Sequence, residues 1–285
     1  MQKRKIEISA EFFPPKTEEG ARQILRTANA IKKFPLDFVS ITYGAGGSSR
    51  ERTIEYGELL REIFNFDVMP HLTCVGHSVD ELRGIISGYR QKGFNRIMAL
   101  RGDPPRNEPN FKPHPNGLAY ASELIHLIKT EFPEMKIACA GYPEKHPEAA
   151  SAEADLQNLK RKVDLGADMI ITQLFFDNSS FFEFARKCRN SGIEKPIHAG
   201  IMPALSLKQA SNFCSMCGSK LPKDLEELLK SANSDEAEEA KIGLNWAKKQ
   251  IAELLESEVE GIHLYILNRP KSAIELMDFL FNKNP

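Results

Sequence analysis

The chain has 285 residues, of which 41% are hydrophobic and 27% are charged, and its formal net charge is -1 at pH 7. This balance is ordinary for a soluble globular protein, and it excludes a sequence-wide basic field that would attract nucleic acid or an anionic membrane. No apolar run is long enough to cross a bilayer, and the basic residues 1–5 precede Glu7 and Glu11 instead of an apolar secretory segment. We therefore expect a cytoplasmic protein that binds neither nucleic acid nor membranes.

Eight short runs along the chain have the length and apolar content of β-strands. The first seven begin at intervals of roughly 30 to 40 residues, which is about the size of a βα repeat. The predicted strands cover residues 6–12, 38–42, 68–73, 97–100, 137–140, 169–172, 197–201 and 262–267.

Helical patterns lie between these strands. Ser78-Val-Asp-Glu81 is a capping box, and Ser49 can cap the helix that follows it. A longer, charge-rich helical excursion, residues 221–256, precedes the last strand. The predicted helices cover residues 17–33, 49–63, 78–93, 120–131, 151–165, 179–190, 206–217, 221–231, 235–256 and 272–281.

Eight strands that alternate with helices, without a linker, predict one (β/α)8 TIM barrel over residues 1–285. The alternative is an open doubly wound sheet, but no Gly-x-Gly-x-x-Gly follows the first strand. The run Gly44-Ala-Gly-Gly-Ser-Ser49 follows the second strand and opens a helix. It can hold an anion at the helix N-terminus, or it can be a plain tight turn.

The five cysteines are an odd number in a long chain without a secretory signal, so we expect free thiols. Cys214 and Cys217 have the spacing of half a zinc site or of a redox pair. No second Cys or His pair stands at zinc spacing, and the pair falls near a predicted helix end. We therefore expect both cysteines to serve packing, and we expect no metal site.

Polar side chains stand where most of the predicted strands end. In a barrel these ends converge on one face, so residues that are distant in sequence meet around one pocket. A single one has a plain explanation, such as a hydrogen-bonded core histidine, a capping amide or a surface ion pair, but together they favour a site. They are Glu11, Thr42, His71, Arg101 with Asp103, Tyr142, Gln173, and Asn268 with Arg269.

Glu11 is the sharpest candidate. Strand alternation places Glu7, Ser9 and Glu11 on one face, and Glu11 is the last of them. Aromatic residues follow it, and their apolar surroundings would raise its pKa, as suits a general acid. Pairing with Arg101 or another cation would lower the pKa instead, and the sequence leaves both alternatives open.

A second polar cluster combines Tyr142 and His146 with the helix that follows them. The positions 155, 158 and 162 of that helix share one stripe, and position 161 lies beside it. A solvated, salt-bridged face is the default interpretation. As a ligand surface, the acid, amide and cations of this stripe would suit a ribose and phosphates.

Seven segments, in order along almost the whole chain, resemble those of methylenetetrahydrofolate reductases. The resemblance implies a (β/α)8 barrel of the short bacterial type, without a regulatory domain. It implies reduction of 5,10-methylenetetrahydrofolate to 5-methyltetrahydrofolate by NADH or NADPH, with ping-pong hydride transfer through FAD, in one-carbon metabolism that feeds methionine synthesis. The segments are Ser9-Ala-Glu-Phe-Phe-Pro-Pro15, Thr42-Tyr-Gly-Ala45, Pro70-His-Leu-Thr73, Ala99-Leu-Arg-Gly-Asp103, Gly141-Tyr-Pro143 with His146-Pro-Glu148, Ile171-Thr-Gln173 and Leu267-Asn-Arg269.

The same resemblance assigns roles to individual residues. Glu11 would be the general acid, and Asp103 would lie near the flavin and the pterin and tune both. The folate-binding residues would be Glu11, Gln173, Gln209, Phe213, which would stack on the ligand, and Arg269. The FAD contacts would be Thr42, Tyr43, Ala45, His71, Arg101, Gly102, Asp103, Tyr120, Ala121, Tyr142, His146, Ala149, Asp155, Asn158, Arg161 and Lys162.

The chain departs from the family pattern in two places. The loop 106–116 is longer than in some bacterial members, which affects the alignment of Tyr120 and Ala121, and Ala199 stands where the family pattern has proline. The alternatives are a flavin-free, pterin- or phosphate-binding barrel transferase or lyase, and a non-catalytic folate-binding barrel. We expect a homo-oligomer, with the excursion 221–256 as a candidate contact surface.

Overall fold

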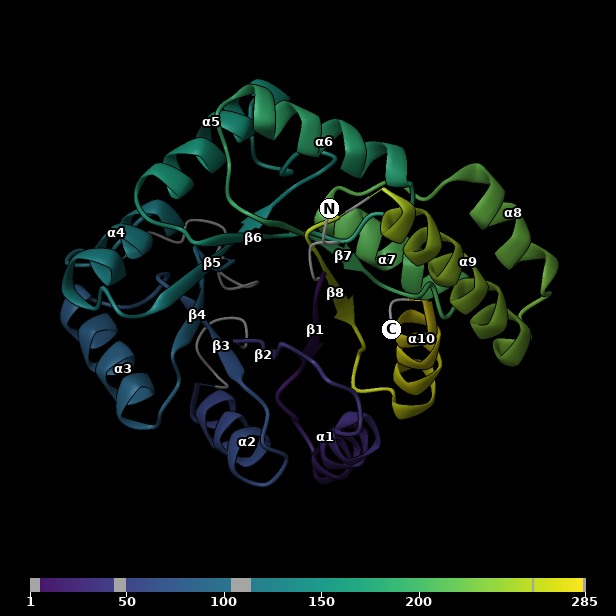
Figure 1. Ribbon diagram of the computed structural model, residues 1–285, viewed down its shortest axis with the longest axis horizontal. Helices are drawn as coiled ribbons and strands as arrows, with labels where there is room; N and C mark the ends of the chain where they lie inside the picture. Colours follow the sequence, from purple (N-terminus) through teal and green to yellow (C-terminus); the bar gives the residue numbers. More distant parts are fainter. Residues whose placement is uncertain (1–5, 44–49, 104–113, 258, 284–285) are drawn as a thin grey trace, which may run out of the picture.

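The computed structural model describes residues 6–43, 50–103, 114–257 and 259–283. Within these residues, eight parallel strands form a closed barrel in which each strand pairs with the next and the eighth pairs with the first. Helices surround the strands on all sides (Figure 1). The predicted (β/α)8 barrel is therefore confirmed, and the open doubly wound sheet is excluded.

The elements follow the order expected from the sequence. The strands are β1 (Glu7–Phe12), β2 (Phe38–Ile41), β3 (Val68–Thr73), β4 (Arg96–Leu100), β5 (Lys136–Gly141), β6 (Met169–Thr172), β7 (Ile197–Ile201) and β8 (Gly261–Tyr265). The helices are α1 (Glu18–Ile31), α2 (Arg50–Glu62), α3 (Val79–Gln91), α4 (Ala121–Glu131), α5 (Ala152–Asp164), α6 (Asn178–Asn190), α7 (Leu207–Cys217), α8 (Lys223–Ser231), α9 (Glu236–Glu256) and α10 (Pro270–Lys283).

Helix α3 begins at the capping box expected from the sequence. The Ser78 hydroxyl accepts a hydrogen bond from the backbone N–H of Glu81, and the Glu81 carboxylate accepts one from the backbone N–H of Ser78. These reciprocal bonds satisfy two donors that the first helical turn leaves free. The Ser49 cap and the anion loop 44–49 lie outside the described residues.

Strand β8 is shorter than the prediction of 262–267. It ends at Tyr265 because Leu267 and Asn268 have positive φ angles of 52° and 51°, which a strand does not accommodate. The Asn268 amide donates to the carbonyl oxygen of Phe13 at 2.8 Å and accepts from its N–H at 3.1 Å. This polar residue at the end of the last strand therefore ties the chain to the loop after β1.

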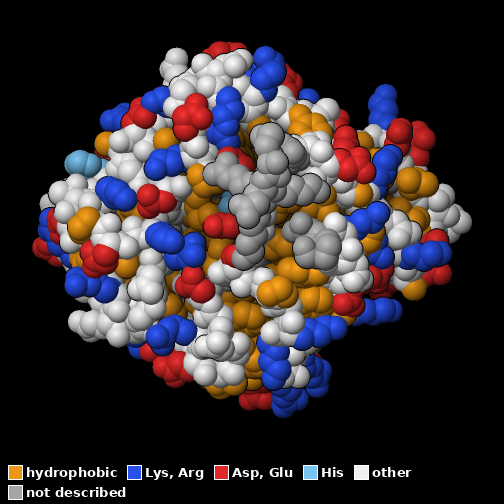
Figure 2. Space-filling view, in the orientation of Figure 1, with side chains coloured by type: hydrophobic (Ala, Val, Ile, Leu, Met, Phe, Trp, Pro, Cys, Tyr) orange, Lys and Arg blue, Asp and Glu red, His pale blue; other side chains and the backbone are white. Residues whose placement is uncertain are grey.

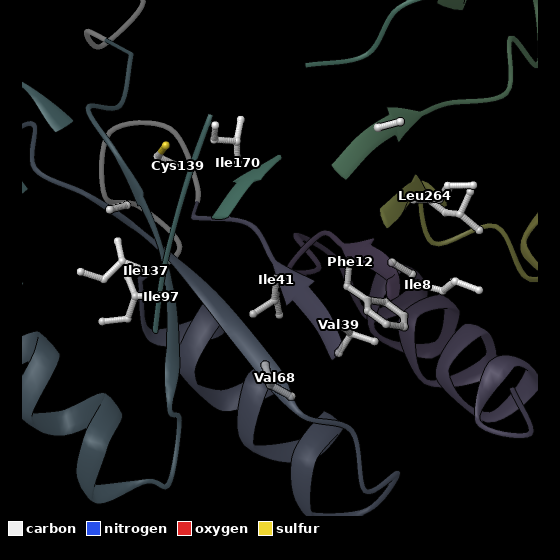
Figure 3. Packing of buried hydrophobic residues seen from close by; sticks show 14 of the residues in the cluster. Ile8, Phe12, Val39, Ile41, Val68, Ile97, Ile137, Cys139, Ile170 and Leu264 are labelled. Atoms are coloured by element: carbon white, nitrogen blue, oxygen red, sulfur yellow. The ribbon is translucent and has the colours of Figure 1, made fainter. Parts of the chain in front are cut away.

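Side chains alternate between two apolar layers along the barrel strands. The larger layer fills the space between the strands and the helices, and Figure 3 shows part of it, including Ile8 and Phe12 of β1. A smaller layer fills the barrel interior and consists of Phe38, Met69, Met98, Ala138, Met169 and Ile171, with Leu100 and Ala140 packed against it. The outer layer binds the helices to the barrel, and the inner layer forms a floor beneath the carboxyl ends of the strands.

The excursion before the last strand packs on the barrel through a third apolar cluster. Trp246 of α9 is partly buried there, and its indole N–H donates to the carbonyl oxygen of Phe176 at 2.8 Å. Gly243 allows α9 to approach the segment after β7, because a Cβ atom at this position would lie 1.9 Å from the carbonyl oxygen of Ala204. A glycine inside this helix is therefore required by packing.

We predict that Gly243→Ala lowers the free energy of unfolding by about 2 to 3 kcal/mol, because the backbone of the segment after β7 must move to admit the methyl group. The matched control is Gly84→Ala in the interior of α3, where nothing lies within 4 Å of an added Cβ. This control should raise stability by about 0.5 to 1 kcal/mol through helix propensity. Urea unfolding measures both, and midpoints that move in the same direction would contradict the packing argument.

Candidate active site

A cavity of about 310 Å³ lies at the carboxyl ends of the barrel strands. Figure 2 shows hydrophobic side chains gathered around the middle of this view, with acidic side chains among them. Candidate residues from five strand ends and from α7 meet in its wall. They are Glu11, His71, Arg101, Gly102, Asp103, Tyr142, His146, Gln173 and Phe213.

Glu11 lies at the centre of a polar network inside the barrel, and only 7% of it is exposed. Its carboxylate lies 3.3 Å from Nε2 of His71 and 3.8 Å from Nε2 of His263, and it accepts a hydrogen bond from the Ser40 hydroxyl at 3.5 Å. The Ser9 hydroxyl lies 2.7 Å from Nδ1 of His263 and so orients that ring. Groups from β1, β2, β3 and β8 thus converge on one acid.

These contacts decide between the two alternatives that the sequence left open for Glu11. Burial raises its pKa, but the polar and electrostatic contacts with the His263 and His71 imidazoles outweigh burial and lower the pKa to about 2. The partners are histidines and not Arg101. Glu11 is therefore a carboxylate in this structure, and it must receive a proton from a neighbour before it can act as an acid.

Arg101 at the end of β4 makes its ion pair with a different loop. Its two terminal nitrogens donate to the Glu148 carboxylate at 2.6 and 2.7 Å, and its Nε donates to the carbonyl oxygen of Gly102 at 3.2 Å. Gly102 has a φ of 88°, and a Cβ there would lie 2.8 Å from Cβ of Thr73. Glycine is needed at this turn, which carries Asp103 to the cavity rim.

Helix α5 makes hydrogen bonds with the end of β5 and with the loop that follows it. The backbone N–H of His146 donates to the Asp155 carboxylate at 2.9 Å, and Lys162 donates to the carbonyl oxygen of Ala140. The Tyr142 and His146 rings meet edge to face, with centroids 4.6 Å apart. Of the polar stripe that the sequence predicts on this helix, Asp155 therefore supports the loop and Lys162 the end of β5, both in the cavity wall.

Other candidate residues lie away from the cavity in the described structure. Thr42 and Tyr43 lie at the end of β2, where the Tyr43 hydroxyl is 3.2 Å from Nε2 of His77, and Tyr120 is 61% exposed at the start of α4. Gln209 lines a shallow neighbouring pocket that shares Phe213 with the cavity. The remaining candidates outside the cavity wall are Ala121, Ala149, Asp155, Asn158, Arg161, Lys162 and Arg269, and Ala45 lies outside the described residues.

Sequence reasoning did not single out His263 and Tyr265, which line the cavity from β8. The alternation rule that found Glu11 on the first strand would have found both. The Tyr265 hydroxyl donates to the carbonyl oxygen of Thr172 at 2.7 Å, and burial raises the pKa of this group. The two rings pack edge to face, with centroids 5.3 Å apart, so Tyr265 helps to hold the imidazole beside Glu11.

Cys217 also lines the cavity, although we expected only a packing role for it and Cys214 from the sequence. Burial and the nearby Asp103 raise the pKa of Cys217 to about 11, and burial together with Glu144 and Cys217 raises that of Cys214 to about 11. Both thiols are therefore protonated at neutral pH. Among the described residues, no group of three or more metal-binding side chains is close enough to hold an ion.

The sequence of almost the whole chain matches a known protein family. A family model described as methylenetetrahydrofolate reductase matches residues 1–280. The chain belongs to the methylenetetrahydrofolate reductase family. The resemblance carried by the seven short segments is thereby confirmed.

Curated relatives within this family have two different lengths. The chain is 38% identical over 268 residues to the 5,10-methylenetetrahydrofolate reductase of Escherichia coli, an alignment that covers 94% of this chain and 88% of that protein. It is 35% identical over 281 residues to "Methylenetetrahydrofolate reductase (NADH) 1" of Arabidopsis thaliana, covering 95% of this chain and 47% of that protein. The chain therefore spans about half the length of the plant relative.

A solved structure from Clostridium thermocellum shares the fold with a TM-score of 0.72 at 16% sequence identity, over 99% of this chain and 96% of that chain. It is described as an uncharacterised protein that binds two copies of 5-methyl-5,6,7,8-tetrahydrofolic acid. At this identity, the likeness supports the barrel architecture alone.

None of the helices in the described part of the chain has the length and apolar character required to span a membrane.

We predict that ionised Glu11 raises the free energy of unfolding and that this contribution is lost at low pH. Its folded-state pKa lies below the ordinary value of 4.5, so its contribution is present above about pH 4.5 and is lost as the pH falls toward 2. Wild type should therefore lose on the order of 2 to 3 kcal/mol between pH 5 and pH 2.5 that Glu11→Gln does not lose.

Urea unfolding at pH 5 and pH 2.5 measures this difference. Glu18→Gln is the matched control, because the Glu18 side chain is 93% exposed, and its pH dependence should follow that of wild type. Parallel loss of stability in wild type and Glu11→Gln would show that the histidine contacts do not stabilise the carboxylate.

Proposed function

We propose that this protein reduces 5,10-methylenetetrahydrofolate to 5-methyltetrahydrofolate with NADH or NADPH, through FAD bound at the barrel mouth. The observation that carries the proposal is a buried carboxylate, Glu11, that faces a cavity together with imidazoles, an arginine and an amide. Membership of the methylenetetrahydrofolate reductase family supports the same reaction. We further propose that the barrel is a complete catalytic unit, that it works in the cytoplasm, and that it forms a homo-oligomer.

The residues around the cavity suit a planar, phosphate-bearing cofactor. Leu100, Leu174 and Met202 provide apolar walls for a ring system, and Phe213 stands at the rim. Arg101 provides a guanidinium for a phosphate, and His71 and His146 provide ring nitrogens for polar edges. When bound, FAD would supply hydride transfer between the nicotinamide and the folate.

Glu11 and its histidines would handle the proton that folate reduction requires. Opening the imidazolidine ring of the substrate leaves negative charge on the departing amine, which must be protonated. A protonated His71, whose Nε2 lies 3.3 Å from the carboxylate, can pass a proton to Glu11, and Glu11 can pass it to the amine. A substrate that covers the cavity removes water from Glu11, which raises its pKa and favours the protonated acid.

The other candidate residues would position the substrate. Asp103 at the rim can accept hydrogen bonds from the pterin, and its charge would act on both rings. The Gln173 side chain accepts a hydrogen bond from the backbone N–H of Leu174 at 2.9 Å, so its orientation is fixed. Phe213 can stack on the folate, and Gln209 lies beside it in the neighbouring pocket.

The proposal predicts that purified protein is yellow and releases FAD on denaturation. Under anaerobic conditions NADH or NADPH should bleach the flavin, and methylenetetrahydrofolate should restore its colour. Because both substrates would use one cavity, initial-rate plots should show the parallel lines of a ping-pong mechanism. A colourless, active enzyme would favour a flavin-free transferase or lyase, and folate binding without bleaching would favour a non-catalytic binder.

We predict that Glu11→Gln retains FAD and its reduction by NAD(P)H, whereas folate reduction falls by at least about 100-fold, because only the folate step needs the proton. Stopped-flow absorbance measures the two half-reactions separately. Glu7→Gln is the matched control on the same strand; Glu7 is 43% exposed and should keep both rates. Equal loss of both half-reactions in Glu11→Gln would exclude a role confined to proton transfer.

A further inference from the structure

Arg101 reaches the cavity wall with most of its hydrogen-bonding capacity in use. Its two terminal nitrogens bind both oxygens of Glu148, and its Nε binds the carbonyl oxygen of Gly102. A guanidinium has five N–H donors, so three are occupied. The two donors that face Glu148 form a fork of the kind that binds a phosphate with two parallel hydrogen bonds.

An anionic ligand at Arg101 therefore meets Glu148 in either of two arrangements. If the ligand uses the same fork, the carboxylate must leave. If it uses one of the two remaining donors, two anions share one cation and repel each other, at a cost that grows with the ligand's charge. The ion pair lowers the pKa of Glu148 and raises that of Arg101, so both groups are charged at neutral pH.

Displacing Glu148 requires the movement of one side chain only. That side chain is 56% exposed, so it can turn into water. The loop that carries it is fixed independently, because the Lys145 ammonium donates to the carbonyl oxygens of His146, Pro147 and Ala149, at 3.1, 3.4 and 2.7 Å. The backbone N–H of Glu148 also binds Nδ1 of His146 at 3.1 Å. The cavity wall thus keeps its shape while the carboxylate leaves.

We propose that Glu148 is a specificity-determining residue that competes with the ligand's phosphate for Arg101 and so weakens the binding of phosphate-bearing ligands alone. This proposal rests on the proposed use of the cavity for FAD. A ligand without phosphate leaves the Arg101–Glu148 pair intact, so its affinity is independent of Glu148. A single weakly bound anion gains little by replacing a bidentate carboxylate, whereas a diphosphate has enough charge to replace it.

The test measures affinities by titration calorimetry, with flavin-free protein and four probes: FAD, ADP, inorganic pyrophosphate and riboflavin. Glu148→Gln should bind the three phosphate-bearing probes about three- to fivefold more tightly, which corresponds to the loss of one partly exposed ion pair. Riboflavin should bind equally to both proteins. Glu153→Gln removes the same charge from the first turn of α5 and should leave all four affinities unchanged.

An Arg101→Gln background completes a double-mutant cycle. There, Glu148→Gln should no longer affect any probe, because the competition requires the guanidinium. Weaker binding of FAD and pyrophosphate to Glu148→Gln would overturn the proposal and make Glu148 a positioning residue for Arg101. An equal gain for riboflavin would also overturn it.

The same data separate this inference from the proposed function. If pyrophosphate binds more tightly to Glu148→Gln but wild type binds no flavin, the competition stands and the flavoenzyme proposal fails. If wild type binds FAD and Glu148→Gln changes nothing, the flavoenzyme proposal stands and the competition fails.

Discussion

The site depends on one buried carboxylate and the two imidazoles that compensate its charge. Burying Glu11 without a partner would cost several kcal/mol, and the imidazoles of His71 and His263, 3.3 and 3.8 Å from the carboxylate, offset that cost. These partners stand on β3 and β8, and the register that places Ser9 opposite His263 arises from the β1–β8 pairing. The pairing of β1 with β8 therefore closes the barrel and also brings His263 to the buried Glu11 carboxylate.

The barrel itself could be predicted because its signals are local. Capping residues, apolar runs and their spacing determine where each strand and helix lies, and the Ser78–Glu81 box formed as expected. The predicted end of β8 was wrong, because the positive φ angles of Leu267 and Asn268 leave no clear trace in the sequence. The convergence of Glu11, His71 and Gln173 also followed from the sequence, since parallel strands of a barrel present their carboxyl ends on one face.

The partners of the charged groups could not be predicted in the same way. The pKa of Glu11 depends on which side chain faces it across the barrel, and His263 reaches it only through the full set of strand pairings. Arg101 binds a glutamate 47 positions further along the chain, at the end of a loop whose path is set by Lys145. Segment order identifies the family, but these pairings require coordinates.

The pairing of β1 with β8 determines when the polar network around Glu11 can form as the chain leaves the ribosome. Ser9 and His263, which touch at 2.7 Å, are separated by 254 positions, so the N-terminal strand emerges long before its neighbour is synthesised. Until then Glu11 remains hydrated, and the hydrogen bonds between the Asn268 side chain and the backbone of Phe13 cannot form. Assembly of the complete Glu11 network is thus among the last events of folding, and a nascent barrel interrupted before β8 lacks one of the two imidazoles that contact this carboxylate.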